Sequence, residues 1–272
     1  MPTSTSHRRR ARRSAGALLL LSAFAGGCAA NAETGSVSTA PILVKKGTLT
    51  VCTDIPYEPF EFMRKGKPVG FDIELVDKVA DRLDLEPAIV DTDFDAIQSG
   101  EALNSDACDV AISAMTITGD RARVLDFSRP YFNASQALVL EQGSGVDELA
   151  DLAGKRIGVQ GGTTGELYVT DNAPDDAEIV PFEDSAAMDA ALEKGQVDAA
   201  VYDNTVVGDV VANNPGLAVA AEFDTGEQYG MAVKKDGNVD LLRTINDVLV
   251  DLKENGGYDK IFGTWFGDAP GA

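Results

Sequence analysis

The sequence predicts an α/β protein made of two similar halves. Short apolar runs alternate with stretches in which apolar residues recur every three or four positions. This alternation indicates strands joined by helices, and therefore mainly parallel sheets. The same order occurs twice along the chain, and in each half an apolar run ends in a polar loop that opens a helix. In open α/β sheets, ligands bind at such carboxyl ends of strands.

The N-terminal segment has the features of an export signal. Arginines crowd positions 8–13, and an apolar stretch follows at 15–25 that is too short to span a membrane comfortably. Small residues then lead to Cys28, which predicts a signal at 1–27 and a lipid on Cys28. An ordinary secretory signal beside an incidental cysteine is the alternative. Residues 28–41 are small and polar, which predicts a flexible tether.

The first half contains the predicted strands 49–52, 88–90 and 109–112, separated by helices at 73–83 and 94–103. In the first of these helices the apolar residues fall at helical spacing. Segment 55–63 is rich in aromatic residues and interrupted by prolines, so it predicts a loop. A hairpin turn is predicted at 65–68.

The second half repeats this order. Strands are predicted at 137–140, 156–159, 178–180, 197–202, 217–220 and 229–233. Helices are predicted at 146–152, 166–170, 185–194 and 204–213, and the chain ends in amphipathic helices at 239–255 and 258–262.

Residues 109–131 look suited to a small anion. An apolar run enters a turn that carries the hydroxyls of Thr116 and Thr118, and Arg121 follows. A strand that leads into a helix start exposes unpaired N–H groups, and the planar guanidinium of arginine fits a carboxylate. An ordinary capped helix with a solvated arginine is the alternative.

A glycine-rich loop at 160–165 occupies the matching place in the second half. It lacks the lysine and the spacing of a nucleotide-binding loop, so a nucleotide is not expected. Its glycines would still let backbone N–H groups approach a small anion closely.

Composition narrows the functions further. The formal net charge of −21 opposes non-specific binding to nucleic acid or anionic lipid. The only histidine is His7 in the predicted signal, so neither a zinc site nor histidine catalysis is expected, and no other metal or cofactor. Cys52 and Cys108 form an even pair in an exported chain, which predicts a disulfide; two buried free thiols are the alternative.

Six segments together carry a resemblance to a known family. They are 54–60 (DIPYEPF), 70–74 (GFDIE), 116–131 (TITGDRARVLDFSRPY), 158–165 (GVQGGTTG), 198–203 (DAAVYD) and 257–267 (GYDKIFGTWFG). In this order they resemble the extracellular solute-binding proteins, family 3, of amino-acid ABC transporters. The resemblance implies a two-lobed periplasmic-binding-protein-like fold of type II, with mainly parallel sheets. Lobe 1 would comprise 42–132 and 229–272, lobe 2 would comprise 137–224, and two crossover hinges would lie near 133–136 and 225–228.

The resemblance also implies a ligand site between the lobes. Arg121 would clamp the α-carboxylate of an amino acid. Thr116 would assist through its N–H and hydroxyl, and Thr164 would donate from lobe 2. Asp203 and the carbonyl of Ala114 would accept hydrogen bonds from the α-ammonium, although Asp203 could instead cap a helix. A zwitterion that leaves water needs both of its charges paired, and this set would pair them.

The ligand side chain would meet a second group of residues. Tyr57 and Phe94 would pack on it, and Asp54 would face its far end. Asp54, Glu58 and Glu61 lie near the expected entrance, which favours a cationic or neutral polar amino acid over an acidic one.

The expected function is the capture of a polar or cationic amino acid and its delivery to the membrane permease of an ABC importer. We expect a monomer outside the cytoplasm, anchored to the membrane by lipid and without enzymatic activity. A dehydratase-like enzyme on the same fold and a sensory ligand-binding domain are the alternatives.

Overall fold

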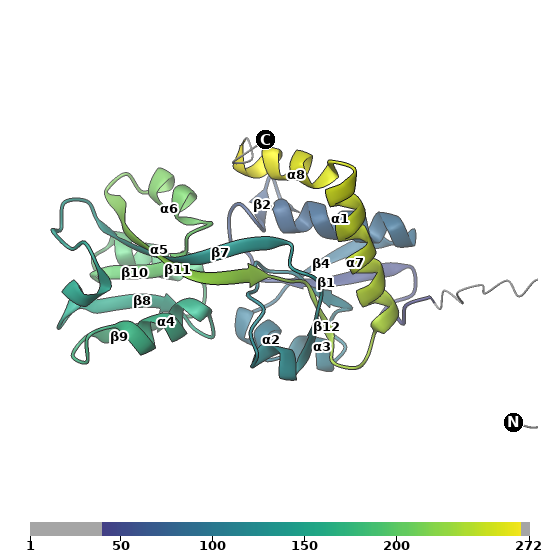
Figure 1. Ribbon diagram of the computed structural model, residues 1–272, viewed down its shortest axis with the longest axis horizontal. Coiled ribbons are helices and arrows are strands. Elements are labelled where there is room, and N and C mark those ends of the chain that lie inside the picture. Colours follow the sequence, from purple (N-terminus) through teal and green to yellow (C-terminus); the bar gives the residue numbers. More distant parts are fainter. Residues whose placement is uncertain (1–39, 268–272) are drawn as a thin grey trace, which may run out of the picture. The chain divides into compact units, whose positions relative to one another are not determined.

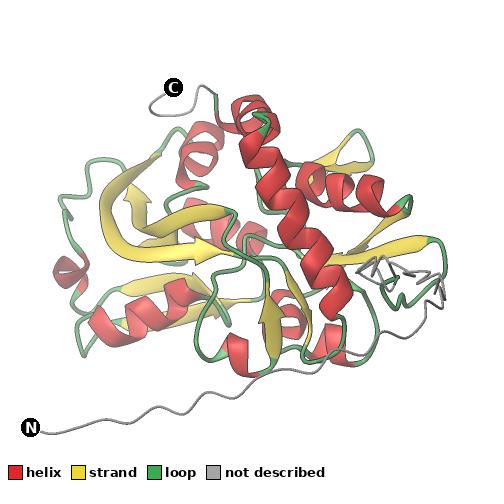
Figure 2. Ribbon diagram, turned by 45° about the vertical axis from the view of Figure 1, so that its right-hand side comes forward, coloured by secondary structure: helices red, strands yellow, loops and turns green. Residues whose placement is uncertain are grey.

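The computed structural model describes residues 40–267. The predicted signal, the predicted lipid on Cys28 and most of the predicted tether lie outside the described residues. Within them the strands form two five-stranded sheets and one two-stranded hairpin. Helices flank the strands of both large sheets (Figures 1 and 2), which confirms the predicted α/β class.

The first sheet, with its helices, forms what we call lobe 1. Its strand order is β4 (Glu86–Asp91), β1 (Thr48–Thr53), β5 (Val110–Ala111), β12 (Ala232–Lys234), β6 (Leu125–Phe127). The predicted turn closes the hairpin β2 (Phe62–Arg64) and β3 (Lys67–Val69). The helices of this lobe are α1 (Phe71–Leu83), α2 (Phe94–Gln98), α3 (Glu101–Asn104), the 3₁₀ helix η1 (Arg121–Arg123), α7 (Val239–Glu254) and α8 (Gly257–Phe266).

The second sheet and its helices form lobe 2. Its strand order is β11 (Leu217–Tyr229), β7 (Phe132–Glu141), β10 (Ala199–Asp203), β8 (Arg156–Gln160), β9 (Glu178–Phe182). The helices are the 3₁₀ helix η2 (Leu149–Leu152), α4 (Thr164–Asn172), α5 (Ser185–Glu193) and α6 (Val207–Asn213).

Two long strands connect the sheets. β7 and β11 pair antiparallel from Leu217 opposite Glu141 to Tyr229 opposite Phe132, and Figure 1 shows them running side by side out of the second sheet. The segments expected as hinges lie inside these two strands. The β11 register shifts between Phe223 and Glu227, where Gly226 has a φ of +63°. A glycine adopts this left-handed conformation without the cost that a side chain would add.

Each five-stranded sheet is mixed, because one strand, β12 in the first and β7 in the second, runs antiparallel to the strands on both sides of it. Two expectations about secondary structure were wrong in detail. The helix expected at 94–103 is two short helices, because Gly100 between them has a left-handed φ of +81°. The segment expected as a helix at 146–152 forms only the 3₁₀ turn Leu149–Leu152.

In the core of lobe 1, the C-terminal helix α8 packs against the start of α1. Gly70 precedes α1 with a φ of +143°, and a Cβ there would lie 1.9 Å from the carbonyl oxygen of Phe60. The buried Phe71 ring contacts the Phe266 ring of α8 at 5.5 Å between centroids. The indole N–H of Trp265 donates to Glu74 at 3.1 Å. The C-terminal helix therefore holds the start of α1 in place.

Cys52 in β1 and Cys108 before β5 are bonded, with their Cα atoms 5.7 Å apart, which confirms the predicted disulfide. Among residues 40–267, no helix combines the length and the apolar character that crossing a bilayer requires.

Candidate functional site

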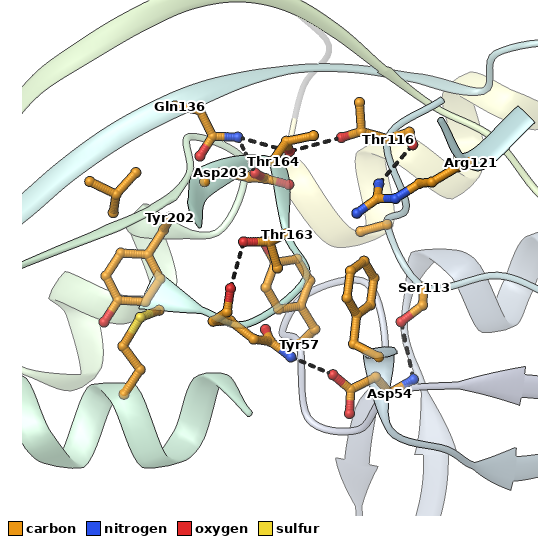
Figure 3. A pocket seen from close by; sticks show the side chains of 16 residues that line it. Asp54, Tyr57, Ser113, Thr116, Arg121, Gln136, Thr163, Thr164, Tyr202 and Asp203 are labelled. Carbon is orange, nitrogen blue, oxygen red and sulfur yellow. Dashed lines mark hydrogen bonds between the residues drawn. The ribbon is translucent and has the colours of Figure 1, made fainter. Parts of the chain in front are cut away.

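One pocket brings together all eight residues that the sequence analysis placed around a ligand. Residues of both lobes line it (Figure 3), and the full lining is Asp54, Tyr57, Phe94, Ser113, Ala114, Thr116, Arg121, Gln136, Gln160, Thr163, Thr164, Gly165, Met188, Val201, Tyr202 and Asp203. The contributing segments are far apart in the sequence, and many of them are the loops that follow strands.

Arg121 is the cationic group of the pocket. Its side chain is buried although it belongs to the short helix η1, whose first N–H is bonded by the hydroxyl of Thr118. The guanidinium donates to the carbonyl of Thr116 at 2.8 Å and, across the lobes, to the carbonyl of Gly162 at 2.9 Å. Its carbon lies 5.1 Å from the ring centre of Phe94. These two bonds use two of its five N–H donors, so it can still hold an acceptor.

Burial shifts the pKa of Arg121 without discharging it. Desolvation lowers this pKa to about 10, while the negative charges of Asp203 and Glu227 act in the opposite direction. The group therefore remains protonated at neutral pH and carries a full positive charge inside the pocket.

The N-terminus of α4 adds backbone donors beside this charge. Thr163 caps the helix by accepting from the N–H of Glu166 at 3.2 Å, and the Glu166 carboxylate accepts from the N–H of Gly162 at 2.8 Å. The N–H groups of Thr164 and Gly165 have no partner inside the helix, because they belong to its first turn. Both residues line the pocket, so the helix start favours an anion there.

Gly162 lets the two lobes approach each other closely. Its φ is +73°, and a Cβ there would lie 2.3 Å from a carboxylate oxygen of Asp95 in α2. The left-handed backbone of Gly162 favours glycine, and it brings this loop of lobe 2 against α2 of lobe 1.

Acceptors for a positive group come from Asp203 and Ala114. Asp203 ends β10 and accepts from Gln136 Nε2 at 2.7 Å and from the hydroxyl of Tyr229. Burial raises the pKa of Asp203 to about 6, although the Tyr229 bond and the Arg121 charge oppose this shift. Ala114 has a φ of +42°, and its N–H is held by Asp72 at 2.8 Å, which leaves its carbonyl as its available polar group.

The opposite end of the pocket is negative. In Figure 3, Asp54 lies far from Gln136 and Thr116. Its carboxylate accepts from Gln160 Nε2 in lobe 2 at 2.7 Å. Burial raises the pKa of Asp54 to about 7, and the charges of Asp91, Asp184 and Asp93 add to this shift. A cationic group bound here would relieve the buried negative charge.

Two acids expected at the entrance lie elsewhere than expected. Glu61 is fully buried and accepts from the Ser113 hydroxyl at 2.6 Å, so it supports the pocket from behind. Glu58 is exposed and does not belong to the pocket lining. Of the three acids, Asp54 alone lines the pocket.

The hydroxyls of Thr116 and Thr164 both point to Glu227. Each donates to Glu227 Oε2 at 2.7 Å, and the two oxygens are 3.4 Å apart. The residues predicted from the sequence to surround the ligand did not include Glu227 or Gln136. Gln136 Nε2 donates to Glu227 at 2.9 Å. A signal existed for Gln136, since it is a single amide beside the apolar run 137–140 of β7. Glu227 gave no comparable signal, because it lies in an alternating, partly exposed strand.

Comparisons with known proteins agree with this architecture. A model of bacterial extracellular solute-binding proteins, family 3, matches residues 49–268. A probable histidine-binding protein of Neisseria gonorrhoeae is 32% identical over 243 residues, which cover 85% of this chain and 88% of that protein.

Two solved structures extend the comparison. An ancestral arginine-binding protein bound to arginine has a TM-score of 0.77 at 42% identity, covering 82% of this chain and 99% of that one. An ancestral arginine-binding protein bound to glutamine has a TM-score of 0.78 at 42% identity, covering 82% and 100%. The two-lobed type II fold is therefore confirmed, and the chain belongs to the bacterial extracellular solute-binding proteins, family 3.

Proposed function

We propose that this protein captures an amino acid with a cationic side chain and presents it to the permease of an ABC importer. One observation carries the proposal: a buried arginine, Arg121, and a partly buried aspartate, Asp203, line the same pocket from opposite lobes. A zwitterion fits such a pair, because each of its charges would lose water and gain an opposite charge.

The α-carboxylate would bind where the donors converge. Arg121 supplies a guanidinium, and the N–H groups of Thr164 and Gly165 supply the positive end of α4. The α-ammonium would bind at Asp203 and at the carbonyl of Ala114. Because these groups come from two lobes, the ligand would stabilise the arrangement in which the lobes meet.

The side chain would extend toward Asp54 between the rings of Tyr57 and Phe94. The relatives named above are a probable histidine-binding protein and arginine-binding proteins, one of them bound to glutamine. These amino acids differ only in their side chains, so this subsite would determine which of them binds. A carboxylate with neighbouring acids and a raised pKa favours a guanidinium or ammonium over an amide. Glutamine would bind more weakly, and glutamate would not bind.

Delivery would use the two lobes and the strands between them. Lobe 1 would comprise 42–132 and 229–272, and lobe 2 would comprise 137–224. The segments 133–136 and 225–228 inside β7 and β11 would act as the hinges. We propose a monomer that a lipid on Cys28 tethers to the outer side of the cell membrane. The relatives are binding proteins, which supports capture without chemical turnover.

A thermal-shift screen of the mature protein tests this function. Arginine and lysine at about 100 times their Kd should stabilise the fold by about 2.7 kcal/mol, which raises Tm by about 5–10 °C. Arg121→Ala should abolish the shift, whereas Arg123→Ala should keep it, because Arg123 is exposed and pairs with Asp120. Circular dichroism would verify the fold of both variants. Micromolar arginine binding by a folded Arg121→Ala protein would contradict the proposed clamp.

A further inference from the structure

Glu227 lies directly behind the pocket at the junction of the lobes. It belongs to the connecting strand β11 and is not part of the pocket lining. One carboxylate oxygen accepts from the hydroxyls of Thr116 in lobe 1 and Thr164 in lobe 2, both at 2.7 Å. The other accepts from Thr225 Oγ1 at 2.7 Å and from Gln136 Nε2 at 2.9 Å.

These bonds determine where the hydroxyl protons lie. A carboxylate only accepts hydrogen bonds, and a hydroxyl has a single proton to donate. Burial would raise the pKa of Glu227, but the donors Thr164, Thr116, Gln136 and Thr225 outweigh it and hold this pKa below its ordinary value. The group is therefore ionised at neutral pH. The protons of Thr116 and Thr164 point to Glu227, so these hydroxyls can offer only lone pairs to the pocket.

We propose that Glu227 is a positioning residue that makes the Thr116 and Thr164 hydroxyls hydrogen-bond acceptors for the α-ammonium group of the ligand. Both threonines line the pocket with Asp203. Gln136 joins the three groups, because its Nε2 is 2.7 Å from Asp203 Oδ1 and 3.4 Å from Thr164 Oγ1. The α-carboxylate is left to Arg121 and to backbone N–H groups, which replaces the expectation that the Thr116 hydroxyl assists it.

This inference rests on the proposed function, and it predicts a specific selectivity. A hydroxyl whose proton is already donated to Glu227 can accept a hydrogen bond from an ammonium group, but it cannot donate one to a carboxylate. Without Glu227 the two hydroxyls could rotate and donate to the carboxylate instead. Loss of Glu227 should therefore weaken the binding of amino acids but not of the same acids without their amino group.

Isothermal titration of the mature protein with arginine and with 5-guanidinopentanoate, its des-amino counterpart, tests this. For wild type the ratio of the two Kd values should be large. In Glu227→Ala the ratio should fall by at least about tenfold, with the des-amino acid bound no more weakly than by wild type. In Glu227→Gln the amide oxygen can still accept from both hydroxyls, so the ratio should stay within about threefold of wild type.

Thr225→Val is the matched control. It removes a hydroxyl bonded to the same carboxylate but outside the pocket lining, so it should leave the ratio unchanged. An equal loss of both ligands in Glu227→Ala would reveal a merely structural role and overturn the inference. A Glu227→Gln ratio as low as that of Glu227→Ala would also overturn it, because charge alone would then account for the effect. No arginine binding by wild type would overturn the proposed function and this inference with it.

Discussion

At the scale of single residues, the protonation of Asp54 should govern ligand choice. Its pKa is raised to about 7, first by burial and then by nearby acids. A guanidinium bound beside it favours the ionised form, so binding of a cation releases the proton that Asp54 holds at lower pH. The affinity for arginine should therefore fall as the pH drops below about 7, by up to about tenfold per pH unit.

Asp54→Asn tests this assignment. The variant keeps an acceptor for Gln160 but loses the charge, so arginine should bind at least about 30-fold more weakly, equivalent to about 2 kcal/mol. Calorimetric titrations of Asp54→Asn between pH 5.5 and 8 should show that its Kd for arginine depends less on pH than that of wild type, because Asp54 no longer titrates. Glutamine is the internal control, since Asp203, with a pKa near 6, affects every amino acid alike. Equal pH dependence for both ligands in wild type would refute the role of Asp54.

At the scale of elements, a buried pair of carboxyl groups holds the Ser113-Ala114 turn against α1. Asp72 accepts from the N–H of Ala114 and from the Tyr131 hydroxyl, both at 2.8 Å, while Glu61 accepts from Ser113. One oxygen of each acid, Glu61 Oε2 and Asp72 Oδ1, is buried without another hydrogen-bond partner. Burial raises the pKa of both groups, and the pair is best satisfied when it shares a proton.

This pair gives stability a definite pH dependence. Burial raises the pKa of Asp72 from 3.8 to about 7, so the folded state holds more protons than the unfolded state in that window. The stability that this group contributes is thus complete below about pH 4 and is lost as pH rises through about 7. Asp72→Asn cannot titrate and its amide can donate to Glu61, so its stability relative to wild type should rise from pH 5 to pH 8. Urea unfolding at each pH measures this.

Asp72→Ala removes the same titration but also leaves the Ala114 N–H and the Tyr131 hydroxyl without their acceptor. It should therefore be less stable than Asp72→Asn by about 2–4 kcal/mol at every pH. A pH-independent difference between wild type and Asp72→Asn would show that the two acids do not share a proton.

The elements that the sequence predicted well are those defined locally. Helices α1 and α7 follow from apolar spacing, and the loops that carry Arg121 and Thr164 follow from strand ends that open helices. The pairing of β7 with β11 could not be predicted this way, because it depends on packing between segments that are far apart in the sequence. Glu227 and Gln136 lie on those strands, and their role depends on that pairing. Gly100 is different, because a glycine within a helical segment is a local signal that the predicted helix 94–103 would be divided.

At the scale of the whole molecule, contacts between the lobes extend beyond the ligand pocket. Gln160 reaches Asp54, Arg121 reaches the carbonyl of Gly162, and the Ser185 hydroxyl donates to the carbonyl of Pro56 at 2.7 Å. The first two involve proposed ligand groups, whereas Ser185 does not line the pocket. If ligand binding is coupled to the meeting of the lobes, each such contact contributes to affinity for every ligand.

Ser185→Ala isolates that coupling. Ser185 opens α5, but the cap is Asp184, which accepts from the N–H of Ala187 at 2.7 Å, so the helix should persist. Losing one exposed hydrogen bond should weaken arginine and glutamine equally, by about threefold, through faster dissociation. Thr264→Ala on the exposed face of α8 is the control and should change neither Kd. Stopped-flow dissociation rates that match wild type would show that this contact forms independently of the ligand, whereas a change in the arginine-to-glutamine ratio would place Ser185 in the side-chain subsite rather than in closure.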